Sequence, residues 1–342
     1  MSVLPPTPRK PALYRPYLDP VRGRYFQEQA VQKALLLVTA ASAGVILLIL
    51  FFLFLKAWPI WRINGLGFIT GTDWDQQFAR AWSAPGESPV WEFGALPLVA
   101  GTLYTTAGAL VLCLPFGLGC AVFLAELCPP RLKAGLESVV RLLAAVPSVI
   151  YGLVGLIVVV PLIRQALISD ELALEMIRIC ALDGTGLLPG ILVLSMMIGP
   201  IFIALATDAL RAVPYRYKEA ALALGLSHWR AIVLVMLPAA RKGLLAGAVL
   251  AAAKALGEAV AMSMVTGSVA HLPSPGHGLV FFLEPVRTLA SNLVDHAEAM
   301  TVPSCEAALF ACATILLVSC TLLSLFARLV VGMSAEGGGR GV

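Results

Sequence analysis

Apolar residues of this chain gather in six long runs that are separated by polar segments. Each run is almost free of charge and holds about 20 residues or more, enough to cross about 30 Å of hydrocarbon as a helix. The runs cover 34–55, 95–124, 142–163, 184–207, 243–267 and 307–327. We therefore predict an all-α polytopic membrane protein with six transmembrane helices.

The second run is too short for two spans and a turn, so it predicts one long helix that bends near Pro115. The first run follows a polar, proline-rich segment, 1–33, which is predicted to be a disordered tail. Because this run is longer than the core of a signal peptide, it predicts a retained anchor. A six-span domain is thus expected over 34–330, followed by a short tail, 331–342.

Basic residues lie mainly in alternate connecting segments. With the N-terminus placed inside, the inside segments hold 17 Lys and Arg residues and the outside segments hold 6, while Lys254 lies within a span. Cytoplasmic segments carry such an excess, so both termini are predicted to be cytoplasmic. This topology accounts for the formal net charge of +4, and no nucleic-acid partner is expected. A mean hydropathy of +0.88, with only 13% charged residues, excludes an ordinary soluble domain.

The two longest outside loops, 56–94 and 268–306, do not resemble a soluble enzyme domain. The first contains five tryptophans, which are typical of interface anchors; docking of an outside partner is the alternative. Of the seven cysteines, Cys180 and Cys305 fall outside, where they are expected as free thiols, with a disulfide as the alternative. The sequence has no G-x-x-x-x-G-K phosphate loop and no metal-ligand spacing, so we expect no ATP hydrolysis, metal or cofactor in this chain.

The predicted cytoplasmic segment 211–241 has the pattern of two short helices. The first is expected to end at Gly225, because glycine readily adopts the left-handed conformation that a helix end needs. Ser227 is a suitable N-cap for the second helix, which Pro238 is expected to end or kink.

One surface of the first helix is kept thin by alanines at positions 220, 221 and 223, so the groove of a partner can approach its backbone. Arg230 lies in the first turn of the second helix, where the helix dipole opposes a positive charge but an acidic partner would favour it. The pattern indicates a hairpin that docks a partner; a solvated interfacial loop is the alternative.

This segment resembles the EAA loop of the binding-protein-dependent ABC-importer permeases at its full spacing. The matching residues are Glu219, Ala220, Ala221, Gly225, Leu237 and Pro238. Val235 stands where the family usually has isoleucine. The resemblance implies that these residues, together with Arg230, form the coupling loop that docks into a cytoplasmic ATPase subunit.

Over roughly 30–330, the chain is similar to the phosphate-specific branch of this family. The runs from Phe93 to Glu126, "LLAAVPSVIYGLVGL" and "ALGEAVAMSMVTG" carry the similarity. Sulfate and molybdate permeases share the EAA loop but usually lack the run seen from Pro147 to Leu156. The stretches "PVRTLASNLVDHAEA" and "ALFACATILLVSCTLLSLFARLVV" are more similar to the PstC type than to the PstA type.

This resemblance implies a type I ABC-importer permease fold and a non-catalytic subunit that moves inorganic phosphate across the cytoplasmic (inner) membrane of a prokaryote. The implied partners are a PstA-like second permease, a PstB-like ATPase homodimer that carries ATP and Mg, and a PstS-like phosphate-binding protein outside.

Lys254 and Glu258 are the ionisable residues within the spans. Spaced four apart, they could meet on one helix face and either neutralise each other or lock the helix to a neighbour. With the resemblance counted, we expect instead that Lys254 faces the substrate pathway and Glu258 holds it charged. The family commonly has arginine where this chain has Lys254.

Two alternatives remain at the level of sequence. One is a permease for another oxyanion, sulfate or molybdate. The other, of a different class, is a secondary transporter or channel that uses the Lys254–Glu258 pair for ion coupling. The EAA loop argues against the second.

Overall fold

The computed structural model describes residues 19–83 and 90–336. It divides into two units, Met1–Phe52 and Leu53–Val342. The first is seen as the N-terminal part of α1 (Asp19–Asn64), a helix that is exposed along its apolar stretch. The prediction of a disordered tail over 1–33 is therefore wrong for 19–33, which are helical; residues 1–18 and 337–342 lie outside the described part.

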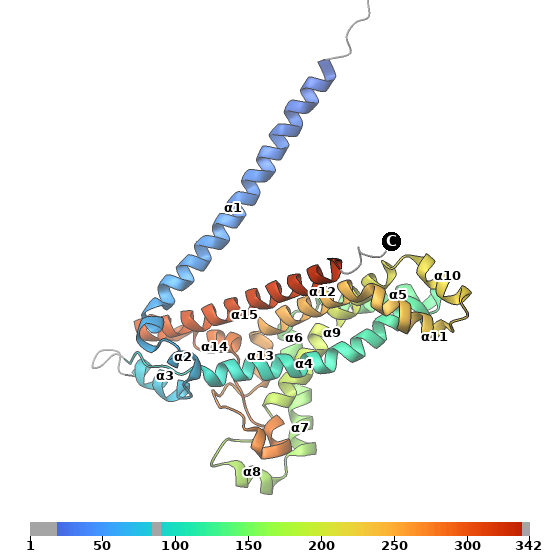
Figure 1. Ribbon diagram of the computed structural model, residues 1–342. Helices are drawn as coiled ribbons and strands as arrows, with labels where there is room; N and C mark the ends of the chain where they lie inside the picture. Colours follow the sequence, from blue (N-terminus) through green and yellow to red (C-terminus); the bar gives the residue numbers. More distant parts are fainter. Residues whose placement is uncertain (1–18, 84–89, 337–342) are drawn as a thin grey trace, which may run out of the picture. The chain divides into compact units, whose positions relative to one another are not determined.

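Within the described residues, the second unit is built from helices, with one isolated bridge between Gly267 and Val286. Figure 1 shows α4, α12 and α15 running side by side, with α10 and α11 at one end and α2, α3 and α14 at the other. The first half of the unit contains α2 (Gly67–Thr70), α3 (Trp74–Ser83), α4 (Leu96–Val122), η1 (Phe123–Leu127), α5 (Pro130–Ala145), α6 (Ser148–Val154), η2 (Gly155–Val159), α7 (Val160–Leu167) and α8 (Asp170–Met176). The second half contains α9 (Leu187–Arg211), α10 (Tyr215–Ala223), α11 (His228–Ala231), η3 (Ile232–Met236), α12 (Leu237–Leu256), α13 (Val260–Val265), η4 (Pro275–Phe282), α14 (Leu289–Asp295), η5 (Ala297–Thr301) and α15 (Pro303–Glu336).

Six helical segments among the described residues are long and apolar enough to cross a membrane, as predicted. They are Val31–Asn64, Leu96–Leu127, Ser148–Leu167, Leu187–Arg211, His228–Leu256 and Pro303–Phe326. The chain is thus a multi-pass, all-helical membrane protein. We call the end that carries α10 the inner end, because the basic-residue pattern predicts it to be cytoplasmic, and the opposite end the outer end.

The third and fifth spans differ from their predicted bounds. The third begins at Ser148 and not at 142, because the extended residue before Pro147 separates it from α5. The fifth begins at His228 and continues through Pro238, which follows the wider π-helical turn η3. Because it begins at His228, the second helix of the hairpin is the start of the fifth span. The span ends at Leu256 and not at 267.

Helix α9 is the centre of the bundle and packs against α4, α5, α12 and α13. Glycines on three neighbouring elements admit its side chains. A methyl group on Gly108 of α4, Gly155 of η2 or Gly243 of α12 would come within 2.6 Å of a side chain of α9. Small residues let membrane helices approach closely, and these contacts hold α9 in a fixed register.

The outer end contains a separate aromatic core. Trp74 is fully buried and lies against Phe68, Phe78 and Phe93 with ring centroids 5.6 to 6.2 Å apart. The expectation that the tryptophans of 56–94 anchor the interface is therefore wrong for Trp74, which is a core residue. Cys180 and Cys305 are both buried free thiols, as expected.

Candidate functional site

The hairpin at the inner end has the geometry that its sequence predicts. Gly225 adopts a φ of +84°, its N–H donates to the carbonyl of Leu222, and the N–H of Leu226 donates to the carbonyl of Ala221. This pair of bonds is the Schellman ending of an α-helix. The Oγ of Ser227 accepts a hydrogen bond from the N–H of Arg230 at 3.4 Å and so caps the next helix.

Much of the hairpin surface is open. Leu224 is 85% exposed and Trp229 is 60% exposed, and Glu219 is also exposed. Of the three alanines expected to form the thin face, Ala221 is buried instead, where it lets α10 lie close to η3, while Ala220 and Ala223 stay on the open face. Large apolar side chains exposed among charged ones are typical of a surface that docks a protein.

The remaining residues of the predicted coupling loop lie in different places. Arg230 is exposed beside Trp229 at the start of the second helix. Leu237 is partly buried and packs against the main core, and Pro238 is exposed in the first turn of α12. Arg230 thus lies on the open surface of the hairpin, whereas Leu237 and Pro238 lie further along the fifth span.

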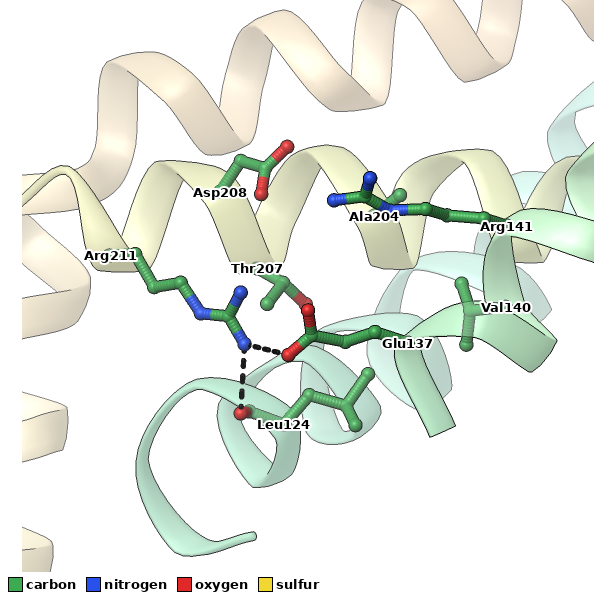
Figure 2. A pocket seen from close by; sticks show the side chains of 8 residues that line it. All are labelled: Leu124, Glu137, Val140, Arg141, Ala204, Thr207, Asp208 and Arg211. Atoms are coloured by element: carbon green, nitrogen blue, oxygen red, sulfur yellow. Dashed lines mark hydrogen bonds and ion pairs between the residues drawn. The ribbon is translucent and has the colours of Figure 1, made fainter. Parts of the chain in front are cut away.

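One ion pair attaches the hairpin to the bundle, and a second joins α9 to α5 just before the hairpin begins. Nζ of Lys218, on α10, lies 2.5 Å from Oε2 of Glu126, on η1, and both side chains are mostly buried. Arg211, the last residue of α9, binds Glu137 of α5 and donates to the carbonyl of Leu124 at 3.4 Å (Figure 2).

Glu137 is a charged residue at neutral pH. The hydrogen bond from Arg211 holds the pKa of Glu137 below its usual value, against the effect of desolvation. Sequence patterns alone did not single out Glu126 and Glu137, although both are carboxylates within a predicted inside segment that also carries basic residues.

Lys254 lies on an open face of the fifth span. It is exposed in the last turn of α12, and it forms no ion pair with another described residue. Arg241 and Lys242 form a basic pair earlier on the same helix. Lys254 lies 12 residues after Lys242, which is about 18 Å along the helix at 1.5 Å per residue. Basic pairs typically mark the inner boundary of a span, so this spacing predicts that Lys254 lies near the middle of the membrane, although it is two residues from the end of α12.

Glu258 lies beyond the end of this helix. Because α12 ends at Leu256, the spacing of four residues no longer places the two side chains on one helix face, and no ion pair joins Glu258 to Lys254. The side chain of Glu258 is buried, and its Oε1 accepts a hydrogen bond from the N–H of Ala261 at 3.3 Å. Gly257, at the break, borders an open groove between α14 and α15.

A second charged cluster closes the outer end. Nη1 of Arg287 lies 2.5 Å from Oδ1 of Asp75, and its Nε lies 3.8 Å from Oδ2 of Asp295. Arg287 also donates to the carbonyl of Ser268, and the N–H of Ala270 donates to Asp75 at 2.9 Å. From the sequence, Arg287 is only one of the six outside basic residues, because its partner Asp75 is distant from it in the chain.

Comparison with known proteins gives the class of this chain. Residues 114–332 match the family model described as binding-protein-dependent transport system inner membrane component, and the chain belongs to this family. Such components work with a second permease, an ATPase and a binding protein.

Three relatives show how far the similarity extends. The chain is 34% identical to the probable ABC transporter permease protein YqgH of Bacillus subtilis, over 75% of this chain and 74% of that one. It is 33% identical to the phosphate transport system permease protein PstC of Mesorhizobium japonicum, over 70% and 73% of the two chains. It is 31% identical to the phosphate transport system permease protein PstC 2 of Mycobacterium bovis, over 96% and 98%.

A solved structure supports the fold. The chain is similar to a chain from inward-facing conformations of the MetNI methionine ABC transporter, with a TM-score of 0.50 and 18% identity, over 68% of this chain and 92% of that one. The predicted importer-permease fold is thereby confirmed.

Proposed function

We propose that this chain is the permease subunit of an ATP-driven importer that moves inorganic phosphate across the inner membrane of a prokaryote. The observation that carries the proposal is the similarity, over 96% of the chain, to a phosphate transport permease of the PstC type. The hairpin at the inner end supports the dependence on ATP. Because this chain has no G-x-x-x-x-G-K phosphate loop, ATP hydrolysis could drive it only through contact with an ATPase subunit.

The partners follow from the same proposal. A PstA-like permease would complete the pathway, a PstB-like ATPase homodimer would bind ATP and Mg, and a PstS-like protein would deliver phosphate outside. This chain would itself hold no cofactor and catalyse no reaction.

The docking surface is proposed to engage the ATPase through α10 and the start of the second helix. Its members are Glu219, Ala220, Arg230 and the exposed apolar residues Leu224 and Trp229. Gly225 and Ala221 act indirectly, since one sets the turn and the other sets the distance of α10 from η3. Leu237 and Pro238 would pass the movement into α12.

Lys254 is proposed to face the pathway, at the junction with the second permease. A lysine held in lipid near the middle of a membrane costs about 2.5–3.5 kcal/mol, so an exposed one is expected to be covered by protein or water. Its place in the last turn of α12 supports this role, because the negative end of the helix dipole favours a positive charge there without a carboxylate. It would lower the barrier for the phosphate anion.

Glu258 is then a positioning residue. Its carboxylate holds the first turn of α13 and so fixes the direction in which the chain leaves the break. It would influence the pathway through this backbone geometry.

The break after α12 is also a feature of secondary transporters, whose sites lie at discontinuous helices. The family membership and the hairpin argue against that class. A permease for sulfate or molybdate remains the alternative within the family.

The test is uptake by proteoliposomes that contain the full complex, with radiolabelled phosphate and the binding protein outside and ATP within. We expect uptake that needs ATP and is not inhibited by excess sulfate or molybdate. Uptake without ATP would support a secondary transporter, and inhibition by sulfate or molybdate would support the other oxyanions.

A further inference from the structure

The two ion pairs at the inner end join segments that are far apart in the chain: one links α10 of the hairpin to η1, and the other links the end of α9 to α5. Lys218 is separated from Glu126 by 92 residues, and Arg211 is separated from Glu137 by 74. Helix α10 follows α9 after three residues, so its movement reaches α9 directly. The second span, in contrast, meets α10 through η1, and α5, the helix that leads into the third span, meets the end of α9.

Glu126 lies on η1, the last turn of the second span. This turn has π-helical hydrogen bonds, which are rarer and less regular than those of an α-helix. Both side chains of the Glu126–Lys218 pair are at most 14% exposed. Because separating a buried pair leaves two poorly solvated charges, η1 is expected to follow Lys218 when α10 moves.

Glu137 lies on α5, the helix that leads through Pro147 into the third span. Helix α5 has no fully buried residue, so its packing alone holds it weakly. Arg211 binds Glu137, and a small cavity beside this pair is also lined by Asp208 and Arg141 (Figure 2). Each member of the pair therefore has a second residue of opposite charge nearby, so this pair can exchange partners, and it is less buried than Glu126–Lys218.

We propose that these pairs form a coupling relay, in which Glu126–Lys218 is the fixed link and Glu137–Arg211 is the exchangeable one. The relay carries displacement of α10 to the second and third spans, and Glu126 and Glu137 are its positioning residues. This inference rests on the proposed ATP-driven import.

The test uses the complete complex in proteoliposomes and measures phosphate uptake and binding-protein-stimulated ATP hydrolysis in the same preparation. The variants are Glu126→Lys, Lys218→Glu, the double swap of both, and Glu137→Gln. We expect each single variant to assemble with the ATPase and to hydrolyse ATP. The ratio of phosphate moved to ATP hydrolysed should fall about tenfold for Glu126→Lys and for Lys218→Glu, and about threefold for Glu137→Gln. The double swap should recover most of the ratio.

An unchanged ratio in the single variants would overturn the relay. Loss of assembly in the single variants, repaired by the swap, together with a normal ratio in Glu137→Gln, would make the pairs structural only and would also overturn it. The wild-type complex separates the two hypotheses: if it moves no phosphate with ATP, the proposed function fails, whereas a working wild type with unaffected variants removes only the relay. Glu175→Gln, at an exposed outer position, is the matched control.

Discussion

The inner and outer ends of the second unit are both held by ion pairs, but the two ends differ in what surrounds those pairs. At the inner end, Arg211 and Lys218 each form an ion pair with one carboxylate, and exposed Leu224 and Trp229 lie on the hairpin. At the outer end, one arginine is shared by two carboxylates beside an aromatic core that contains Trp74 and Phe78.

This difference indicates different tasks. The inner end is attached at a few points and presents an apolar surface, which suits a region that a partner protein binds and displaces. The outer end is closed by packed rings beside a charge cluster whose arginine is buried, and a buried arginine is costly to separate from its carboxylates. Rigid packing outside and sparse attachment inside would let force applied at the hairpin move one end without loosening the other.

The largest expected effect is at the outer end. Arg287→Ala leaves Asp75 and Asp295 without their shared counter-charge, which is expected to destabilise the fold by about 3 kcal/mol. We expect a much lower yield of monodisperse complex and a lower melting temperature. Arg178→Ala, at an exposed position outside, should change neither. Normal melting of the Arg287 variant would mean that the outer end is not held by this cluster.

Between the two ends, Lys254 should affect transport and leave stability unchanged. Lys254→Ala removes a charged contact of the kind that contributes about 1.5–3 kcal/mol, so phosphate uptake is expected to fall about 10- to 100-fold with normal complex yield. Lys254→Arg should retain uptake, since arginine also binds phosphate.

Lys242→Ala is the control for this experiment, because Lys242 lies on the same helix at its inner boundary. If Lys254→Ala assembles and transports normally, Lys254 has no role in the pathway. If assembly alone fails, the residue serves the junction between the permeases.

At the inner end, Gly225→Val should uncouple the hairpin. No atom outside its local chain lies within 4 Å of the site of an added Cβ, so the cost comes from the positive φ, about 1–2 kcal/mol. We expect normal insertion into the membrane but loss of the copurifying ATPase. Gly135→Val, which is equally open but lies on the regular helix α5, should retain it. Uptake equal to the wild type would remove the docking role of the hairpin.

The smallest effect concerns pH at the outer end. Burial, and then the charge of Arg287, lower the pKa of His296 below its usual 6.5. The unfolded state therefore binds more protons below pH 6.5, so stability is full above that pH and falls as the pH decreases. Melting of the purified complex should drop between pH 7.5 and 5.5, and His296→Gln should reduce the drop. An identical drop in the variant would assign the pH dependence to other groups.

Local sequence signals predicted the inner hairpin well. A glycine that follows an alanine-rich run and a serine two residues later are sufficient to place a helix ending and a helix start, because both depend on backbone groups within a few residues. The six apolar runs were equally clear, since span length depends on the thickness of the membrane.

Features that depend on distant segments could not be predicted in this way. The sequence predicts Trp74 to be an interface anchor, because its contacts with Phe68 and Phe93 appear only in the structure. Arg287 likewise resembles an ordinary loop residue in the sequence, because its pairing with Asp75 depends on the fold. The end of α12 at Leu256 could not be predicted, because the apolar run extends from 243 to 267 without a change at the break. Hydrophobicity indicates that a segment lies in the membrane, but it does not indicate where a helix within that segment ends.

The glycines that admit α9 have a consequence for the order in which the protein is made. Helix α4 and η2 precede α9 in the chain and α12 follows it, so two of its three glycine-bearing neighbours are already synthesised when α9 enters the membrane. Helix α9 is therefore expected to fit into a preformed slot that α12 closes last. A bulky residue at Gly108 should stop assembly while the chain is still growing, whereas one at Gly243 should affect only the closing step.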